Sequence, residues 1–148
     1  MGAHVSIAMY QRNIPLRYRL VGQRCQTCGG VNFPPRAVCS QCSKGTRFED
    51  IQLSGRGVLY SWTRIAGAGA PSEFAAQAQA LGSFVVGLVQ LEEGPRVVAQ
   101  IVEVGRSAPR LGQRVEAVLR RIYEEDGVIR YGYKFRPAGD AAPTPPGK

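Results

Sequence analysis

The stretch that decides the fold runs from Cys25 to Cys42 and reads CQTCGGVNFPPRAVCSQC. It holds two C-x-x-C pairs with ten residues between them, and it contains all four cysteines of the chain. Each pair forms a tight turn that presents two sulfurs to one ion, so the two pairs together supply a closed tetrahedral site. Glycines follow the first pair, where the backbone is expected to turn with a positive φ. The candidate metal ligands are Cys25, Cys28, Cys39 and Cys42.

Zinc is the ion that this ligand set favours, and four sulfurs leave no open coordination position, so we expect a structural role. Rubredoxin-type iron uses the same four ligands, and the spacing alone does not separate the two metals. Two disulfides would need an oxidising compartment, and a redox-active C-x-x-C motif is disfavoured because two pairs occur together. A ribbon of fewer than ~30 residues buries too little apolar surface to fold alone, so the metal is expected to supply much of its folding free energy.

Positive charge is concentrated around this stretch. The chain carries a net charge of +8, but residues 1–48 hold seven Lys and Arg and no acid, whereas residues 49–148 hold twelve against eleven acids. Four thiolates around one divalent ion leave an excess of negative charge that nearby arginines offset. Part of the basic character therefore compensates the metal site and need not indicate a nucleic-acid partner.

The rest of the chain divides into segments of different composition. We expect an N-terminal helical segment over residues 1–20, limited in length by Pro15. The ribbon is expected over residues 21–48, a barrel over 49–137, and a disordered, proline-rich tail over 138–148. Residues 67–82 are rich in Ala, Gly and Gln and predict a mobile loop or a short weak helix over Glu73–Leu81.

Five strands are expected in the barrel region. A small closed or nearly closed barrel fits this number of strands, and an OB-fold matches it. The fold class is therefore mainly β, with a helical segment, a zinc ribbon and a five-stranded OB-fold. The expected strands lie within residues 49–66, Phe84–Leu91, Arg96–Val102, Val115–Ile122 and Val128–Phe135.

Side-chain alternation in the last strand bears on nucleic-acid binding, the alternative function from another class. OB-folds bind single strands by interleaving basic and stacking aromatic residues on one exposed face. Here Tyr131, Tyr133 and Phe135 point one way, whereas Lys134 and its basic neighbours point the other. We therefore expect the aromatic face to fill the barrel. The face that carries Val58, Tyr60 and Trp62 is expected to do the same.

Ordered motifs along the chain resemble a known family. The sequence is similar to the acyl-CoA-associated family with an N-terminal rubredoxin-like zinc ribbon and a C-terminal OB-fold, long filed as a domain of unknown function. The resemblance covers roughly residues 16–137. The motifs are Tyr18-Arg19-Leu20-Val21-Gly22, the two cysteine pairs with Phe33-Pro34-Pro35-Arg36 between them, Leu53 to Thr63, Leu91 to Arg96, Leu111-Gly112-x-x-Val115 and Tyr133-x-Phe135-x-Pro137.

The resemblance implies a function that the spacing does not show. Members of the family form hetero-oligomers with thiolase-like enzymes that make or break carbon–carbon bonds next to a thioester, by thiolytic or retro-aldol chemistry. The small subunit braces its partner and helps to wall the acyl-CoA channel, while the catalytic residues belong to the partner. Degradation of aromatic or steroid acyl-CoA compounds and acetoacetyl-CoA metabolism are candidate pathways.

Catalysis by this chain alone finds no support in the sequence. Its single histidine, His4, lies in the N-terminal segment, and the cysteines are better explained as ligands than as nucleophiles. No catalytic residue is therefore assigned. A basic face is a candidate for contacts with the phosphates of CoA, although a solvated charged surface explains it as well. The candidates are Arg56, Arg64, Arg130, Lys134 and Arg136.

Two further expectations concern the surroundings of the chain. Its apolar stretches are much shorter than the ~20 residues of a spanning helix, and polar residues interrupt the N-terminus where a signal peptide would be apolar. We therefore expect a cytoplasmic protein. Both faces of Phe84–Leu91 are apolar, so the outer face needs cover from the ribbon, the N-terminal helix or another chain.

Overall fold

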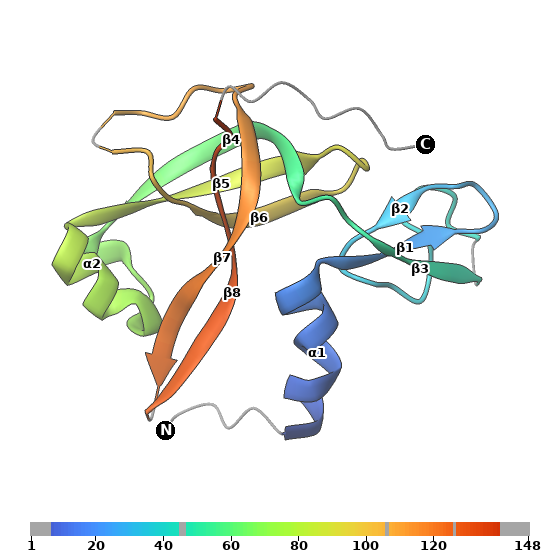
Figure 1. The fold of residues 1–148 in the computed structure, drawn as a ribbon, viewed down its shortest axis with the longest axis horizontal. Coiled ribbons are helices and arrows are strands. Elements are labelled where there is room, and N and C mark those ends of the chain that lie inside the picture. Colours follow the sequence, from blue (N-terminus) through green and yellow to red (C-terminus); the bar gives the residue numbers. More distant parts are fainter. Residues whose placement is uncertain (1–6, 45–46, 106, 126, 140–148) are drawn as a thin grey trace.

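The computed structural model describes residues 7–44, 47–105, 107–125 and 127–139. His4 and residues 140–148 of the expected tail lie outside the described residues. The chain forms a small three-stranded ribbon sheet and a larger barrel, with an N-terminal helix between them (Figure 1). Neither helix in the described ranges has the length and apolar character needed to cross a bilayer.

The N-terminal helix α1, Ile7–Arg19, lies within the expected segment, but Pro15 does not end it, since the helix continues for about one further turn. An interior proline removes one helical hydrogen bond. Packing compensates for this loss, since α1 lies against the barrel and the Tyr133 hydroxyl donates to the backbone carbonyl of Tyr18. The helix ends where Leu20 adopts a φ of +47°, with its side chain buried in the core.

The ribbon sheet has the order β2-β1-β3, built from β1 (Val21–Cys25), β2 (Val31–Asn32) and β3 (Phe48–Gln52). Both pairings are antiparallel. Residues 49–52, expected at the start of the barrel region, therefore belong to the ribbon sheet. The chain returns from the second cysteine pair directly beside β1, where the backbone groups of β3 find their partners.

The barrel strands follow one another in the order β4-β5-β6-β8-β7. The sheet closes because β7 also pairs with the first residues of β4. All pairings are antiparallel except the one between Ile101 and Phe135. This arrangement confirms the predicted five-stranded OB-fold. The strands are β4 (Arg56–Ala66), β5 (Ser83–Leu91), β6 (Arg96–Ile101), β7 (Arg114–Glu125) and β8 (Val128–Pro137).

One apolar core joins the barrel to the ribbon. Leu59, Val89 and Phe135 are almost completely buried inside the barrel, and the same cluster extends to Leu20 and Val31. Such burial supplies the dominant favourable term in folding. The ribbon and the barrel therefore share a packed interface instead of being connected only by a linker.

A β-bulge in β4 changes which residues face the core. The register between β4 and β5 shifts between Leu59 and Ser61, so the strict alternation of side chains is broken there. The expectation that Val58 and Tyr60 fill the core with Trp62 is wrong. Leu59 is buried, Tyr60 is 52% exposed, and Trp62 is half-buried against the core.

The aromatic face of β8 enters the core only in part. Phe135 is buried and Tyr133 is half-buried, but Tyr131 is 44% exposed and Ile129 is also exposed. The β7–β8 hairpin extends beyond the closed part of the barrel, as Figure 1 shows, so its far end has no opposite wall to pack against. The prediction that this whole face fills the barrel is therefore wrong for Tyr131.

Residues 67–82 fold back onto the barrel as short helical turns, η1 (Gly67–Gly69), η2 (Ser72–Phe74) and α2 (Ala75–Leu81). Of the two alternatives that the sequence left open, a mobile loop or a short helix over Glu73–Leu81, the structure shows a helix over Ala75–Leu81. The ring of Phe74 lies 5.8 Å from that of Phe84 and 6.0 Å from that of Tyr123, measured between centroids. Part of the outer face of β5 is thus covered by this chain itself.

Candidate metal centre and partner surface

The structure brings the four cysteines together at one end of the ribbon. Their sulfurs all lie within 4.8 Å of one another, with Cys25–Cys42 at 3.9 Å and Cys28–Cys39 at 3.7 Å. A tetrahedral ion with bonds of about 2.3 Å holds its sulfurs about 3.8 Å apart, whereas a disulfide needs about 2.05 Å. The spacing therefore fits one four-coordinate ion and no disulfide.

The two cysteine pairs have the same local geometry. In each, a backbone N–H just after the second cysteine donates to the carbonyl of the first, from Gly29 to Cys25 at 2.8 Å and from Ser43 to Cys39 at 3.0 Å. These two donors also have positive φ values, +75° and +57°. The positive φ expected after the first pair is thus confirmed at Gly29. A glycine adopts this conformation without steric cost.

Asn32 supports the site from outside the ligand set. Its side chain is 2% exposed, and its amide lies 3.6 Å from the Cys39 sulfur. Its oxygen accepts hydrogen bonds from the backbone N–H and the hydroxyl of Ser40, at 2.9 and 2.7 Å. This residue fixes the second pair against β2, and the cysteine spacing gave no sign of it.

Thiol pKa values in the cluster differ widely. Backbone N–H groups of Cys42 and Gln41 lower the pKa of Cys39 to about 6. The backbone N–H of Gly30 acts in the same direction on Cys28, but desolvation and the neighbouring sulfurs outweigh it and raise that pKa to about 12. Four sulfurs at this distance resist joint ionisation because like charges repel. A divalent cation removes that conflict and therefore suits the cluster.

The five candidate residues for CoA phosphates do not form one site. Arg56 is ion-paired with Glu92 at 3.2 Å, and Arg136 is paired with Glu116 at 2.7 Å. The other three line separate hollows. Arg64 lies beside α2, Arg130 lies near the Tyr123 ring, and Lys134 lies between η2–α2 and the β7–β8 hairpin.

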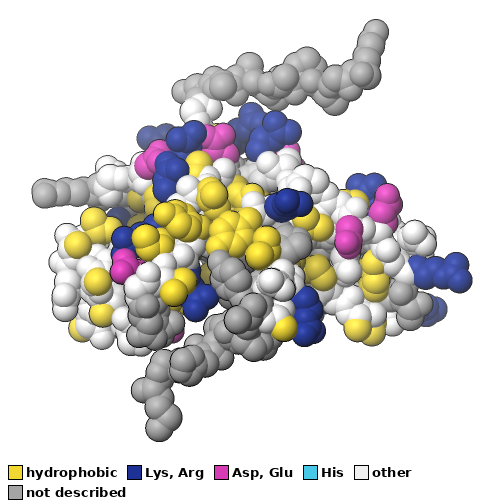
Figure 2. All heavy atoms as spheres, turned by 60° about the horizontal axis from the view of Figure 1, so that its bottom comes forward, with side chains coloured by type: hydrophobic (Ala, Val, Ile, Leu, Met, Phe, Trp, Pro, Cys, Tyr) yellow, Lys and Arg dark blue, Asp and Glu magenta, His cyan; other side chains and the backbone are white. Residues whose placement is uncertain are grey.

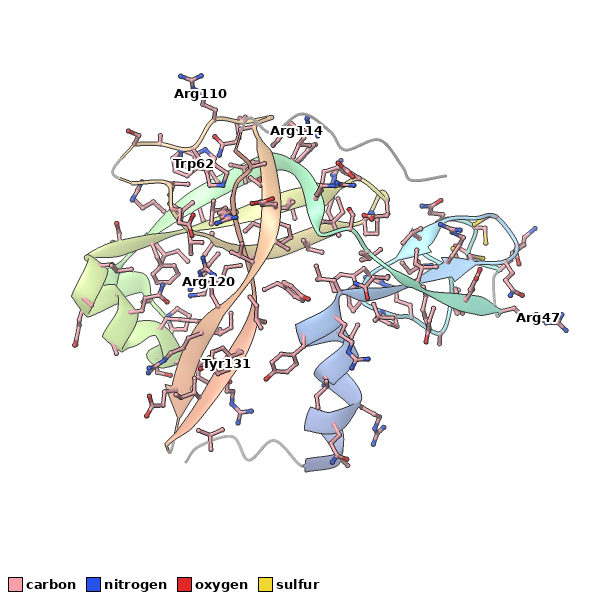
Figure 3. All side chains as sticks on the ribbon, viewed as in Figure 1. Arg47, Trp62, Arg110, Arg114, Arg120 and Tyr131 are labelled. Atoms are coloured by element: carbon pink, nitrogen blue, oxygen red, sulfur yellow. The ribbon has the colours of Figure 1, made fainter. Side chains whose placement is uncertain are left out.

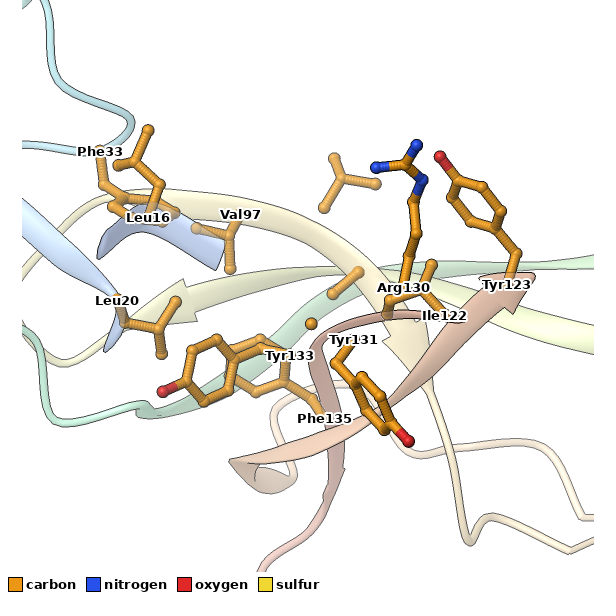
Figure 4. A pocket seen from close by; sticks show the side chains of 13 residues that line it. Leu16, Leu20, Phe33, Val97, Ile122, Tyr123, Arg130, Tyr131, Tyr133 and Phe135 are labelled. Atoms are coloured by element: carbon orange, nitrogen blue, oxygen red, sulfur yellow. The ribbon is translucent and has the colours of Figure 1, made fainter. Parts of the chain in front are cut away.

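An apolar groove of about 330 Å³ lies where the helix, the ribbon and the barrel meet. Leu16 of α1 and Phe33 of the ribbon form one end, and Arg130 and Tyr123 lie at the other (Figure 4). The aromatic side chains of β8 form one wall between them. The groove thus offers a long apolar surface with a cation at one end.

Exposed apolar side chains surround this groove. Val98, on the outer face of β6, is 72% exposed, and Tyr131 on β8 is 44% exposed. Figure 2 shows apolar side chains gathered in the middle of the face that carries the groove, with basic side chains at parts of its edge. We call this the groove face and define it by the residues that line the groove, among them Val98 and Tyr131. Contiguous apolar surface of this kind is typical of interaction sites.

Family models match both parts of this architecture. Residues 12–49 match the rubredoxin-like zinc ribbon domain of ChsH2, and residues 50–120 match the C-terminal OB-fold domain of ChsH2. The class of protein is therefore a ChsH2-like zinc ribbon joined to an OB-fold.

Two similar proteins show the family to which this chain belongs. A DUF35 domain-containing scaffold protein of Methanocaldococcus jannaschii is 45% identical over 128 residues, which cover 85% of this chain and 86% of the relative. A protein of the same description from Pyrococcus furiosus is 40% identical over 93% of this chain and 96% of the relative. The chain belongs to the DUF35 domain family.

Two further matches concern subunits of enzymes. The benzoylsuccinyl-CoA thiolase subunit BbsA of Thauera aromatica is 34% identical over 79% of this chain and 75% of BbsA. A chain of the solved structure described as Ltp2-ChsH2(DUF35) aldolase superposes with a TM-score of 0.65 at 23% identity, covering 93% of this chain and 98% of that one. The second match supports the fold alone, and the first agrees with a general accessory-subunit role.

Proposed function

We propose that this chain is a non-catalytic subunit that binds a thiolase-like enzyme and supports its action on acyl-CoA, in thiolytic or retro-aldol carbon–carbon cleavage or the reverse. The observation that carries the proposal is the 34% identity to a subunit of a CoA-thioester thiolase. The four cysteines are gathered at one metal-type site, which supports their role as ligands and not as nucleophiles.

Structural zinc in the ribbon is part of this proposal. Cys25, Cys28, Cys39 and Cys42 would hold the ion, and all four positions would be filled by sulfur. The ion would hold the two turns together and stabilise the end of the ribbon. It would leave no site for a substrate, so its role would be in folding and not in chemistry.

The groove face is the proposed docking surface for the partner. Val98 and Tyr131 expose apolar area that the described part of this chain leaves uncovered, whereas Phe84 on the outer face of β5 is covered by Phe74. Interfaces between subunits place apolar and aromatic side chains at their centre and charged ones at the rim. The distribution of side chains in Figure 2 has this form.

The groove itself would form part of the wall of the acyl-CoA channel. Its apolar walls suit the acyl or pantetheine portion of the ligand, and Arg130 supplies a positive charge at one end. Of the five candidate residues for CoA phosphates, Arg130 is the one that lies in this groove. Arg130 is therefore the preferred candidate for a phosphate contact.

Single substitutions on the groove face test the proposal. Tagged wild-type chain and the V98D, Y131D and L111D variants would serve as baits in lysate of the source organism, with retained proteins identified by mass spectrometry. Leu111 is the matched control, since it is 65% exposed and adjoins Arg110 at the opposite end of the barrel from α1 (Figure 3).

The proposal predicts that wild type and L111D retain a thiolase-like chain, whereas V98D and Y131D retain at least about tenfold less, because a buried unpaired carboxylate is costly. Equal retention by all four baits would contradict the docking surface. Recovery of nucleic acid without such an enzyme would contradict the function and favour a single-strand-binding OB-fold protein.

A further inference from the structure

Lys134 occupies an unusual environment for a lysine. It lies on β8 opposite Val118 of β7, and only 5% of its surface is exposed. Its ammonium group forms no hydrogen bond or ion pair with the residues that the structure describes. Burial of an unpaired charge is costly, and folded proteins usually avoid it or pair the charge. A ligand that supplies the missing partner would remove this cost.

The charges around Lys134 do not supply that partner. Arg120, which the cross-strand register places on the same face of the hairpin, projects toward the side of the barrel that carries α2 (Figure 3). It is paired with Glu103 at 2.9 Å. Burial, together with the positive charge of Arg120, lowers the pKa of Lys134. Glu103 is thus already held by an arginine.

Lys134 lines a pocket of about 590 Å³ between the η2–α2 segment and the β7–β8 hairpin. Ile122, Tyr123 and Ala76 give it apolar walls. Gln77 and four charged side chains, Lys134 among them, complete the lining. The volume is in the range of small-molecule sites. The pocket therefore combines apolar side chains with polar ones, and Lys134 is the lining cation that has no ion-pair partner among the described residues.

The other charged residues that line the pocket limit the charge of its ligand. Arg121 is engaged by Glu124 at 2.6 Å, so this pair is internally neutral. Glu73 of η2 also lines the pocket and accepts a hydrogen bond from Ser72 at 3.4 Å. One available cation and one carboxylate suit a ligand with a single negative charge, because a dianion would be repelled more strongly by Glu73.

We propose that this pocket binds the carboxylate of a small organic acid, with the Lys134 ammonium donating to the carboxylate and Ile122 and Tyr123 packing against the ligand's apolar part. A charge-assisted hydrogen bond of this kind is among the stronger polar contacts in proteins. The pocket is built from this chain alone, so the inference does not depend on the proposed enzyme partner. It also gives Lys134 a ligand other than the phosphates of CoA.

Lysine-selective isotope labelling provides a direct test, because the chain has three lysines, at positions 44, 134 and 148. The probe is hexanoate. Hexanamide serves as its uncharged analogue, and inorganic phosphate serves as an alternative anion. Hexanoate is expected to shift the side-chain NMR signal of Lys134 saturably and to raise the pH at which that signal titrates. The signals of Lys44 and Lys148 should remain in place.

Variants separate binding from folding. K134M and K134Q are expected to lose at least about tenfold in hexanoate affinity by calorimetry, whereas K44M, a change at an exposed lysine, should bind as wild type does. Hexanamide should bind at least about tenfold more weakly than hexanoate. Unchanged affinity in both Lys134 variants, or equal shifts at all three lysines, would overturn the site. Phosphate binding as tight as that of hexanoate would overturn the assignment to a carboxylate.

Discussion

The ribbon and the barrel are stabilised by different means, although they share one core. The largest completely buried side chains of the barrel are apolar, namely Phe135, Leu59, Leu91, Val89 and Val115. In the ribbon, the corresponding side chains are Cys25 and Cys39, which are candidate metal ligands. Burial of apolar area stabilises the barrel, whereas we expect the ribbon to depend on the ion that its cysteines are placed to bind.

The groove face depends on both the ribbon and the barrel. Leu16, Phe33 and Val97 come from the helix, the ribbon and the barrel, and all three line the groove. The position of Phe33 depends on the ribbon, and that of Val97 depends on the barrel core. Damage to either part is therefore expected to disturb the proposed docking surface, but to different extents.

The largest effect is expected when a metal ligand is removed. C25S or C42S should abolish metal binding and unfold the ribbon, because structural zinc contributes about 10–16 kcal/mol in comparable small domains. Metal analysis and heteronuclear NMR would measure both changes, and V38A, an exposed change between the pairs, is the control. A serine variant that stays folded and active without metal would refute the structural role of the site.

A smaller effect is expected from a cavity in the barrel. L59A should destabilise the chain by about 2–5 kcal/mol, because Leu59 is completely buried and packs where Gly87 leaves room for it. Chemical denaturation would measure the loss, and the metal content should stay at the wild-type level. Loss of metal in L59A would show that the two parts are not stabilised independently.

Asn32 contacts the ligand Cys39 from outside the ligand set, and its removal should weaken metal binding without abolishing it. N32A is expected to lower metal affinity about 10–100-fold, because second-layer hydrogen bonds orient the ligands. Competition with a chromogenic chelator would measure the change. An affinity equal to that of wild type would mean that the contact with Cys39 has no influence on the ion.

The smallest effect is expected at Lys134, and it is stabilising. K134M should raise the free energy of unfolding by about 1 kcal/mol at neutral pH, because it removes a buried unpaired charge. The pKa of Lys134 is lower in the folded chain than its ordinary value, so the unfolded chain binds more protons between the two values. Wild-type stability should therefore rise with pH in that window and approach that of K134M. A gap that widens with pH would contradict this sign.

The metal-type site and the fold class were predictable because they depend on local features. Two C-x-x-C pairs bring four sulfurs together through short turns, and glycine marks one of those turns. The order of apolar segments and turns was enough to predict five barrel strands. Both predictions stay correct even when the expected ends of a strand are wrong by a few residues.

The strand register and the surfaces that other segments bury were not predictable, because both depend on contacts between distant segments. Gly57 and Leu59 take the inward face of β4, so Tyr60 lies at the surface, and the bulge after Leu59 then turns Trp62 toward the core. Tyr131 alternates as a core residue would, yet it lies toward the far end of the β7–β8 hairpin (Figure 3) and is exposed.

Asn32 acquires its role from Cys39 and Ser40, which the ribbon turn brings beside it. Lys134 faces a pocket formed partly by η2 and α2, far along the chain. Neither placement appears in the sequence pattern.

The most direct test of the proposed accessory role is native mass spectrometry of the complex purified through a tag on this chain from its source organism. The account predicts a thiolase-like chain in fixed ratio with this one, one zinc ion for each copy of this chain, and acyl-CoA carbon–carbon bond turnover that needs both chains. Recovery of this chain alone, or with nucleic acid in place of the enzyme, would contradict the account.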